Sequence, residues 1–196
     1  METLEIVQVG APVLRSRAAE VPLAEIGTER FQALIAGMVA TMRAAPGVGL
    51  AAPQIGLPFR VFVAEDPEPL EAGVGAEERR ARGREPLPLR VFVNPVLRAV
   101  GDARATFFEG CLSVEGYTAL VERSLEVEVT GLDEKGAPTS LLAKGWPARI
   151  MQHEMDHLDG VLYVDRMLTR SFATVEQARS LYAGKSIAEV RQLLGA

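Results

Sequence analysis

The stretch Gly-Trp-Pro-Ala-Arg-Ile-Met-Gln-His-Glu-Met-Asp-His-Leu-Asp-Gly, residues 145–160, decides how the rest of the sequence is interpreted. It predicts a helix that begins near Trp146, because the missing N–H of Pro147 costs nothing in a first helical turn. Gly160 is the residue type that most often ends a helix in the left-handed conformation. Apolar residues beside the histidines indicate that this helix is buried: Ile150, Met151, Met155 and Leu158.

His153 and His157 are the only two histidines in the chain. Residues four apart lie on one face of a helix, so both imidazoles can reach one metal ion. Two buried imidazoles without partners would be costly, whereas a shared metal satisfies both. Glu154 lies about 100° around the helix axis from His153, where it can approach a water on the metal without being a ligand itself. We therefore predict a metal site on this helix.

A third protein ligand must come from elsewhere, because two are too few for a tight tetrahedral site. Cys111 is one candidate. It is the only cysteine, and it lies in the stretch Glu-Gly-Cys-Leu-Ser at 109–113, after a predicted strand that contains Phe107 and Phe108. A downstream carboxylate, either Asp165 or Glu176, is the other possibility. The residues alone leave these three candidates open.

The remaining sequence alternates between helical and strand patterns. Apolar residues at helical spacing predict an amphipathic helix from Thr28 to Ala45. The small residues at 47–54 predict a loop, and the polar segment 64–90 predicts a surface insertion between two strands of one sheet. Strands are predicted at 61–63, 91–93, 125–130, 139–143 and 161–164, with one or two weaker helices after them. Strands joined by hairpins, with helices set apart, indicate an α+β fold built on antiparallel sheets.

The composition is that of a globular protein. A chain of 196 residues predicts a single domain, 1–196, and 48% hydrophobic with 24% charged residues excludes disorder for most of its length. The net charge of −5 argues against a nucleic-acid partner. No run of about 20 apolar residues predicts a membrane span. The single cysteine and the acidic start at 1–5 suit a cytoplasmic protein, or one whose import segment has been removed.

Three segments together resemble the signature motifs of the peptide deformylase family. They are Gly-Val-Gly-Leu-Ala-Ala-Pro-Gln at 47–54, Glu-Gly-Cys-Leu-Ser at 109–113 and Gln-His-Glu-Met-Asp-His-Leu at 152–158, in the order expected of that family. The segments 89–95 and 145–149 further resemble the mitochondrial and plastid subgroup, which also occurs in bacteria. The resemblance implies antiparallel sheets packed around a central helix that carries the His-Glu-x-x-His motif.

The resemblance implies removal of the N-formyl group from the N-terminal formyl-methionine of newly synthesised polypeptides. The metal would be held by Cys111, His153 and His157, with a water that attacks the formyl carbon while Glu154 acts as general base and then acid. Fe(II) is expected in the cell, and Zn, Ni or Co is possible in purified protein. Two donors to the reacting oxygen are implied as well: the Gln54 side chain and the Leu112 backbone N–H.

The implied substrate is an N-formyl-methionyl peptide, which makes a transient contact with the ribosome plausible. By the same resemblance, the peptide backbone is held by Val48, Gly49 and Gly110. We expect the methionine side chain to meet Trp146, Ile150 and Phe107, and Glu109 to pair with Arg123 behind the metal ligands. Three positions depart from the usual family pattern: Pro46, Glu115 and Thr118.

Two other classes of function remain open from the sequence. One is a metallopeptidase of the His-Glu-x-x-His class, with Glu176 or Asp165 as its third ligand. The other is a binding module in which the metal is only structural. Glu154 argues against the second, because a structural site needs no base beside its ligands.

Overall fold

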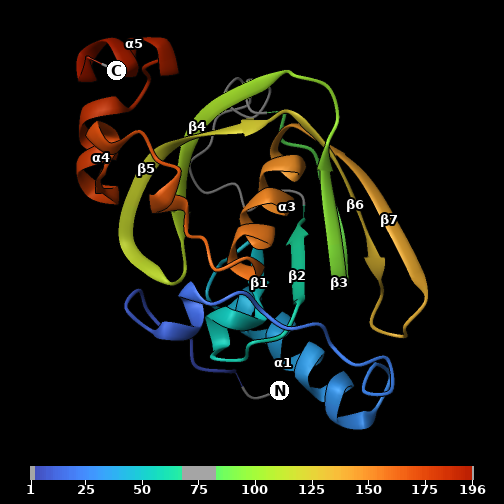
Figure 1. Ribbon diagram of the computed structural model, residues 1–196. Helices are drawn as coiled ribbons and strands as arrows, with labels where there is room; N and C mark the ends of the chain where they lie inside the picture. Colours follow the sequence, from blue (N-terminus) through green and yellow to red (C-terminus); the bar gives the residue numbers. More distant parts are fainter. Residues whose placement is uncertain (1–2, 68–82, 196) are drawn as a thin grey trace.

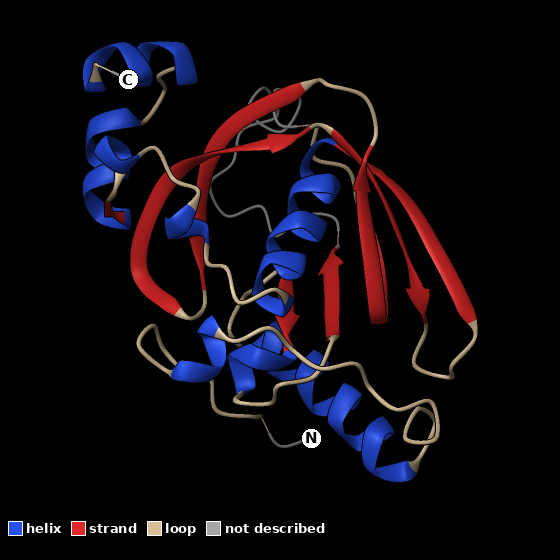
Figure 2. Ribbon diagram, viewed as in Figure 1, coloured by secondary structure: helices blue, strands red, loops and turns tan. Residues whose placement is uncertain are grey.

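Two antiparallel sheets enclose one long helix, α3 (Gly145–Leu158), in the computed structural model, which describes residues 3–67 and 83–195 (Figure 1). The larger sheet has the strand order β1-β2-β3-β6-β7, and the smaller one has the order β4-β5-β8. Figure 2 shows the helix between the two red sheets, with the remaining helices outside them. The predicted α+β fold around a central helix is thereby confirmed.

The elements other than α3 follow one another in chain order. The strands are β1 (Gly49–Ala51), β2 (Val61–Asp66), β3 (Leu87–Ala99), β4 (Arg104–Cys111), β5 (Val114–Ser124), β6 (Glu126–Leu132), β7 (Pro138–Lys144) and β8 (Ala173–Thr174). The α-helices are α1 (Glu29–Ala44), α4 (Val175–Tyr182) and α5 (Ile187–Leu194). Short 3-10 helices are η1 (Pro12–Arg15), η2 (Ala52–Ile55), η3 (Tyr163–Asp165) and η4 (Thr169–Ser171).

Strand β2 is buried on both faces and joins two parts of the core. Successive side chains of a strand point to opposite faces. Phe62 therefore packs with Met151 and Leu158 of α3, while Val61 packs with Met38 of α1. This double burial explains why the strand is apolar without alternation.

The segment 47–54, predicted as a loop, contains regular structure. Residues Gly49–Ala51 form β1, which pairs antiparallel with β2, and Ala52–Ile55 form η2. The loop prediction was wrong because small residues allow either a turn or close strand pairing, and only the neighbouring strand decides between them.

The predicted insertion 64–90 is shorter than its sequence pattern indicates. Strand β2 continues to Asp66 and β3 begins at Leu87, and both of these side chains are buried. Arg84 pairs with Asp66 at 2.7 Å, which offsets the burial of that carboxylate. The rest of the predicted insertion includes residues 68–82, which lie outside the described residues.

The strand predicted at 161–164 does not form. Leu162 is buried without a ladder partner, and η3 begins at Tyr163. The Leu162 N–H instead donates to Asp165 Oδ2 at 2.8 Å. A short apolar run has the same sequence pattern whether it forms a buried strand or an irregular segment with buried side chains. The pattern could therefore not distinguish these two structures.

The predicted C-terminal helices are confirmed as α4 and α5. Thr174 and Ser186 each cap one of them through a side-chain oxygen that accepts a backbone N–H. Among the described helices, none combines the length and the apolar composition that crossing a bilayer requires.

The turn after α3 gives a first testable prediction. Gly160 has φ = 75°, and a Cβ at this position would lie 2.9 Å from the backbone of Arg15. Gly160→Ala should lower the free energy of unfolding by about 3 kcal/mol, because left-handed strain and a clash with rigid backbone add together. Urea unfolding followed by circular dichroism measures it.

Gly184 provides the matched control for Gly160. Its φ is 73°, but nothing lies within 4 Å of a Cβ built there. Gly184→Ala should therefore cost only the conformational strain, about 1 kcal/mol. Equal losses in the two variants would show that the contact with Arg15 has no energetic weight.

Candidate metal centre

The cysteine and both histidines meet at one point between the two sheets. Cys111 ends β4, and the histidines lie on α3 one turn apart. One ligand atom from each of Cys111, His153 and His157 lies within 4.8 Å of the others. Cys111 Sγ is 3.3 Å from His157 Nε2. The described part of the chain contains no other cluster of three His, Cys, Asp or Glu side chains this close together.

These donors fit a single metal ion. Metal–sulfur and metal–nitrogen bonds of about 2.3 and 2.1 Å place two tetrahedral ligands about 3.6 Å apart, close to the observed separation. A ligating histidine also needs a partner for its other ring nitrogen, and His153 Nδ1 lies 3.0 Å from Glu109 Oε2. A carboxylate at this nitrogen fixes the tautomer and leaves Nε2 to bind the metal.

Glu109 anchors the His153 imidazole through its carboxylate. Its carboxylate is 5% exposed and accepts two hydrogen bonds from Arg123, at 3.0 and 2.9 Å. Burial favours the neutral acid, but hydrogen bonds from His153 and Arg123 outweigh it and hold the pKa of Glu109 well below its usual value. The predicted pair of Glu109 and Arg123 is present, and it is buried rather than on the surface.

The two imidazoles have opposite electrostatic environments. Burial, the largest influence on His153, favours its neutral form, yet hydrogen bonds to Cys111 and Glu109 outweigh it and raise the pKa of His153 well above its usual value. Burial, followed by the charge of His153, holds the pKa of His157 well below its usual value. Because an imidazole binds a metal only when it is neutral, a divalent ion competes with a proton at His153.

Glu154 points into the same space without contacting the cluster as a ligand. The residue is 3% exposed, and its Oε2 has no hydrogen-bond partner. Burial raises the pKa of Glu154 to about 7. A carboxyl group that exchanges a proton near neutral pH is suited to general acid–base chemistry. A bound divalent ion nearby would lower this pKa, because it favours the charged carboxylate.

Gly49 makes room for Glu154. A Cβ built on Gly49 would lie 2.1 Å from Glu154 Oε1 and 2.5 Å from its Cδ, so no side chain fits there. The sequence did not predict this contact, because it joins two segments far apart along the chain.

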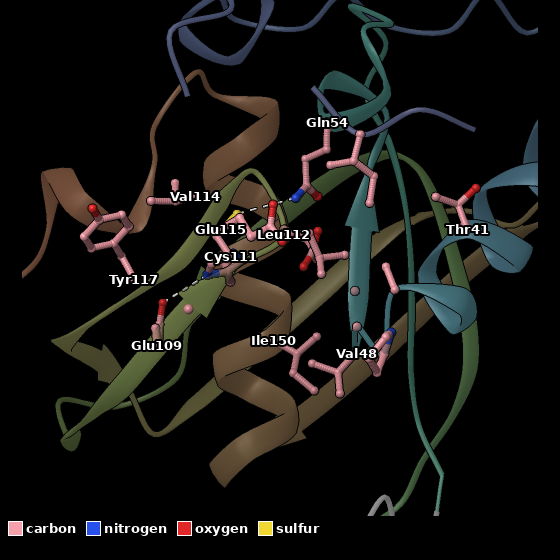
Figure 3. Close-up of a pocket in the computed structure, with 18 of the residues that line it drawn as sticks. Thr41, Val48, Gln54, Glu109, Cys111, Leu112, Val114, Glu115, Tyr117 and Ile150 are labelled. Atoms are coloured by element: carbon pink, nitrogen blue, oxygen red, sulfur yellow. Dashed lines mark hydrogen bonds and ion pairs between the residues drawn. The ribbon is translucent and has the colours of Figure 1, made fainter. Parts of the chain in front are cut away.

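Gln54 lies on the opposite side of the cluster from the helix and is 1% exposed. Its Oε1 accepts the Ala51 N–H at 2.8 Å, which directs Nε2 toward Cys111 Sγ at 3.5 Å and Ser113 Oγ at 3.4 Å. Figure 3 shows Gln54 and Cys111 converging from different elements. Gln54 is therefore a buried amide held in place by the backbone beside it.

A pocket of about 980 Å³ opens onto the cluster. Of the residues predicted to hold the metal, act in catalysis or bind the peptide backbone, all except His157 line it: Val48, Gly49, Gln54, Gly110, Cys111, Leu112, His153 and Glu154. Trp146 and Ile150 are in its wall as expected. Phe107 is not among the lining residues, and instead its ring meets Trp146 edge-on at 6.5 Å between centroids. Pro46 and Glu115, two of the departures from the family pattern, also line the pocket.

The other two candidate ligands lie outside the cluster. Asp165 forms an ion pair with Arg15 and accepts the Leu162 N–H. Glu176 is in the first turn of α4. Neither belongs to the Cys-His-His cluster. Of the three candidates, the structure therefore brings only Cys111 next to both histidines.

Sequence reasoning missed one residue of this region, Arg149. Its guanidinium donates to Glu109 Oε1 at 2.5 Å, and the residue is 4% exposed. A charged residue one turn before His153, beside apolar neighbours on a helix predicted to be buried, was the available signal.

The fold and the donor set together define a class: α+β proteins whose central helix carries donors for one metal ion beside a buried carboxylate. Comparison with known proteins makes this specific, because residues 3–172 match the family model described as Polypeptide deformylase. The chain belongs to the polypeptide deformylase family.

Relatives and solved structures agree with this family. "Peptide deformylase 1A, chloroplastic" of Solanum lycopersicum is 54% identical over 172 residues, which cover 88% of this chain and 62% of that protein. "Peptide deformylase, mitochondrial" of Homo sapiens is 47% identical over 170 residues, with coverages of 87% and 70%. A Met-Ala-Ser-bound class I type b peptide deformylase from Acinetobacter baumannii superposes with a TM-score of 0.75 at 34% identity, over 85% of this chain and 99% of that one. The chain thus spans less than two thirds of the tomato relative.

Proposed function

We propose that this protein removes the N-formyl group from the N-terminal formyl-methionine of newly synthesised polypeptides. The observation that carries the proposal is the buried carboxylate of Glu154 in the same pocket as the Cys-His-His cluster. Membership of the polypeptide deformylase family supports it. So does the A. baumannii structure, which holds Met-Ala-Ser.

Cys111, His153 and His157 would hold the metal ion. When bound, a divalent ion there supplies Lewis acidity, which makes a water a competent nucleophile near neutral pH. One thiolate and two imidazoles suit Fe(II), Zn or Ni by their chemistry. Fe(II) in the cell is part of the proposal, on the basis of family resemblance.

Glu154 moves the proton in this proposal. Its carboxylate takes the proton of the attacking water, and the same oxygen then gives a proton to the departing amine. The lack of a competing partner at Oε2 leaves that oxygen available for both steps.

Gln54 and Leu112 stabilise the charge that develops on the formyl oxygen. The Gln54 Nε2 is directed at the cluster by its anchored Oε1. Leu112 follows Cys111 and would contribute its backbone N–H. Such donors act strongly because they are positioned before the reaction and shielded from water.

An extended peptide would add to one edge of each sheet. Strand β1 is at one end of the larger sheet and β4 at one end of the smaller, so both are edge strands. Gly49 belongs to β1 and Gly110 to β4, and Val48 precedes β1. Main-chain hydrogen bonds to a strand edge give affinity, while a pocket selects a side chain. The wall formed by Trp146 and Ile150 would take the methionine.

Gln54→Ala should lower kcat about 100-fold, because one donor to the developing oxyanion is lost. Steady-state assays with formyl-Met-Ala-Ser measure this. Gln54→Glu is the control variant, since it keeps an acceptor for the Ala51 N–H but removes the N–H donor. A comparable loss in Gln54→Glu supports the donor role, whereas near-normal turnover would mean that Gln54 acts only by holding Ala51.

Gly49→Ala should lower kcat by about 100-fold, because an added methyl group displaces the Glu154 carboxylate by an ångström or more. Gly47→Ala is the control. There a Cβ would meet Leu112 Cδ1 at 2.8 Å, the end of a flexible side chain that can move. We expect a much smaller loss for Gly47→Ala with the same peptide. Equal losses would show that the two positions matter only as backbone beside the substrate.

The proposed function is tested with purified protein, loaded anaerobically with Fe(II) and given formyl-Met-Ala-Ser. The appearance of a free amine at a steady rate is the expected result, and removal of the metal by a chelator should abolish it. Persistence of the intact formyl peptide would contradict the proposal and favour a binding module. Cleavage between internal residues would instead favour a peptidase.

A transient contact with the ribosome belongs to the same proposal, and co-sedimentation with ribosomes tests it.

A further inference from the structure

Arg149 is a buried charge for which the proposed reaction has no use. It lies on α3 one turn before His153 and is 4% exposed. Burying a guanidinium costs several kcal/mol unless every donor is satisfied. Its contacts therefore show what the molecule gains from it.

One set of contacts joins Arg149 to the back of the metal cluster. Its Nη1 donates to Glu109 Oε1 at 2.5 Å and to the Val121 carbonyl at 3.0 Å, and its Nη2 donates to the Ala105 carbonyl at 2.7 Å. The other oxygen of Glu109 lies 3.0 Å from His153 Nδ1. The guanidinium thus ties that carboxylate to both β4 and β5, and fixes the group that orients His153.

A second set of contacts joins Arg149 to the wall of the pocket. Its Cζ lies 5.3 Å from the centroid of the Phe107 ring and 5.9 Å from that of Trp146. Trp146 lines the pocket and so does Arg149 itself, whereas Phe107 does not. A planar guanidinium packs against aromatic faces as well as donating in its plane, which a lysine ammonium cannot reproduce.

We propose that Arg149 is a positioning residue that holds two parts of the site together: the Glu109 carboxylate behind His153, and the Trp146 wall of the substrate pocket. The effect of Arg149 on turnover rests on the proposed function, but its effects on metal affinity and on the position of the Trp146 ring do not. The geometry predicts that these two effects can be separated, because charge serves the first and the planar shape serves the second.

Two substitutions separate these effects. Arg149→Met removes both the charge and the planar group. The affinity for Co²⁺, measured by competition with a chelator, should then fall about 10-fold, as is typical when a group that orients a ligand is lost. Arg149→Lys keeps a donor for Glu109 and should hold Co²⁺ within about 3-fold of the unsubstituted protein. Both variants should weaken the binding of Met-Ala-Ser to the Co²⁺ form by about 2- to 5-fold, the size of a lost cation–π contact.

Trp146 gives a readout that needs neither turnover nor peptide. It is the only tryptophan in the chain, so fluorescence excited selectively at the indole, where the tyrosines do not absorb, reports on this wall alone. Quenching of that fluorescence by acrylamide should increase in both Arg149 variants, because the ring loses the guanidinium packed against it.

Arg60→Met is the matched control. Arg60 is also a buried arginine and also contacts α3, but it donates to the Leu158 carbonyl and to Asp159 at the far end of the helix. Arg60→Met should lower the thermal midpoint while leaving Co²⁺ affinity, peptide binding and fluorescence quenching unchanged.

The proposal is overturned if Arg149→Met behaves like Arg60→Met, with a lower thermal midpoint but unchanged Co²⁺ affinity and quenching. If Arg149→Met does not fold, Arg149→Lys decides: quenching and Met-Ala-Ser binding equal to those of the unsubstituted protein would overturn it. Failure of the proposed function is distinguishable, because it would appear as absent turnover of formyl-Met-Ala-Ser in the unsubstituted protein.

Discussion

Glu154→Gln is expected to lower kcat for formyl-Met-Ala-Ser by about 10³- to 10⁴-fold while the protein keeps its metal. Glutamine has nearly the same shape, so it fits over Gly49, where there is no room for a larger group. It cannot accept the proton of the attacking water or return one to the amine. Because Glu154 is not part of the Cys-His-His cluster, metal content should stay at that of the unsubstituted protein.

Metal content and turnover must be measured on the same Glu154→Gln sample. Glu154→Asp is the companion variant, since it retains the carboxylate but shortens the side chain. We expect its loss to be smaller than that of Glu154→Gln, because an acid–base group remains in the pocket. Turnover by Glu154→Gln within about 10-fold of the unsubstituted protein would contradict the assignment of Glu154 as the base.

Cys111→Ser is expected to abolish measurable deformylation and most metal retention. A serine hydroxyl is neutral near pH 7 and is a harder ligand than a thiolate, so the site loses both a negative charge and a soft donor. A serine at this position also leaves the Gln54 Nε2 without its sulfur contact. Elemental analysis of anaerobically purified protein, together with the formyl-peptide assay, measures both losses.

Glu176→Gln is the control for the third ligand. Glu176 lies on α4 and is not part of the metal cluster, so this variant should keep both metal and activity. The opposite result, with loss in Glu176→Gln and retention in Cys111→Ser, would restore the metallopeptidase reading that the sequence left open.

Much of the scaffold could be predicted because its signals are local. The helix at 29–44 has apolar residues at helical spacing and a threonine cap, both of which act within a few residues. Two of the predictions that were wrong, at 47–54 and 161–164, concern short segments of small or apolar residues. In such segments the choice between strand, turn and 3-10 helix depends on neighbours far along the chain.

The sequence by itself determined the donors that α3 contributes, because helix geometry places His153 and His157 on one face and Glu154 beside them. Only the tertiary structure decided what meets them. Cys111 lies 46 residues before His157, and the register of β4 against β5 brings its sulfur to 3.3 Å from that imidazole. Likewise, the packing of α3 against β1 places Glu154 over Gly49. The packing of α3 against the smaller sheet lets Arg149 donate a hydrogen bond to Glu109. Spacing along one helix is set by bonds, whereas contacts between distant segments depend on strand register and on how the core packs.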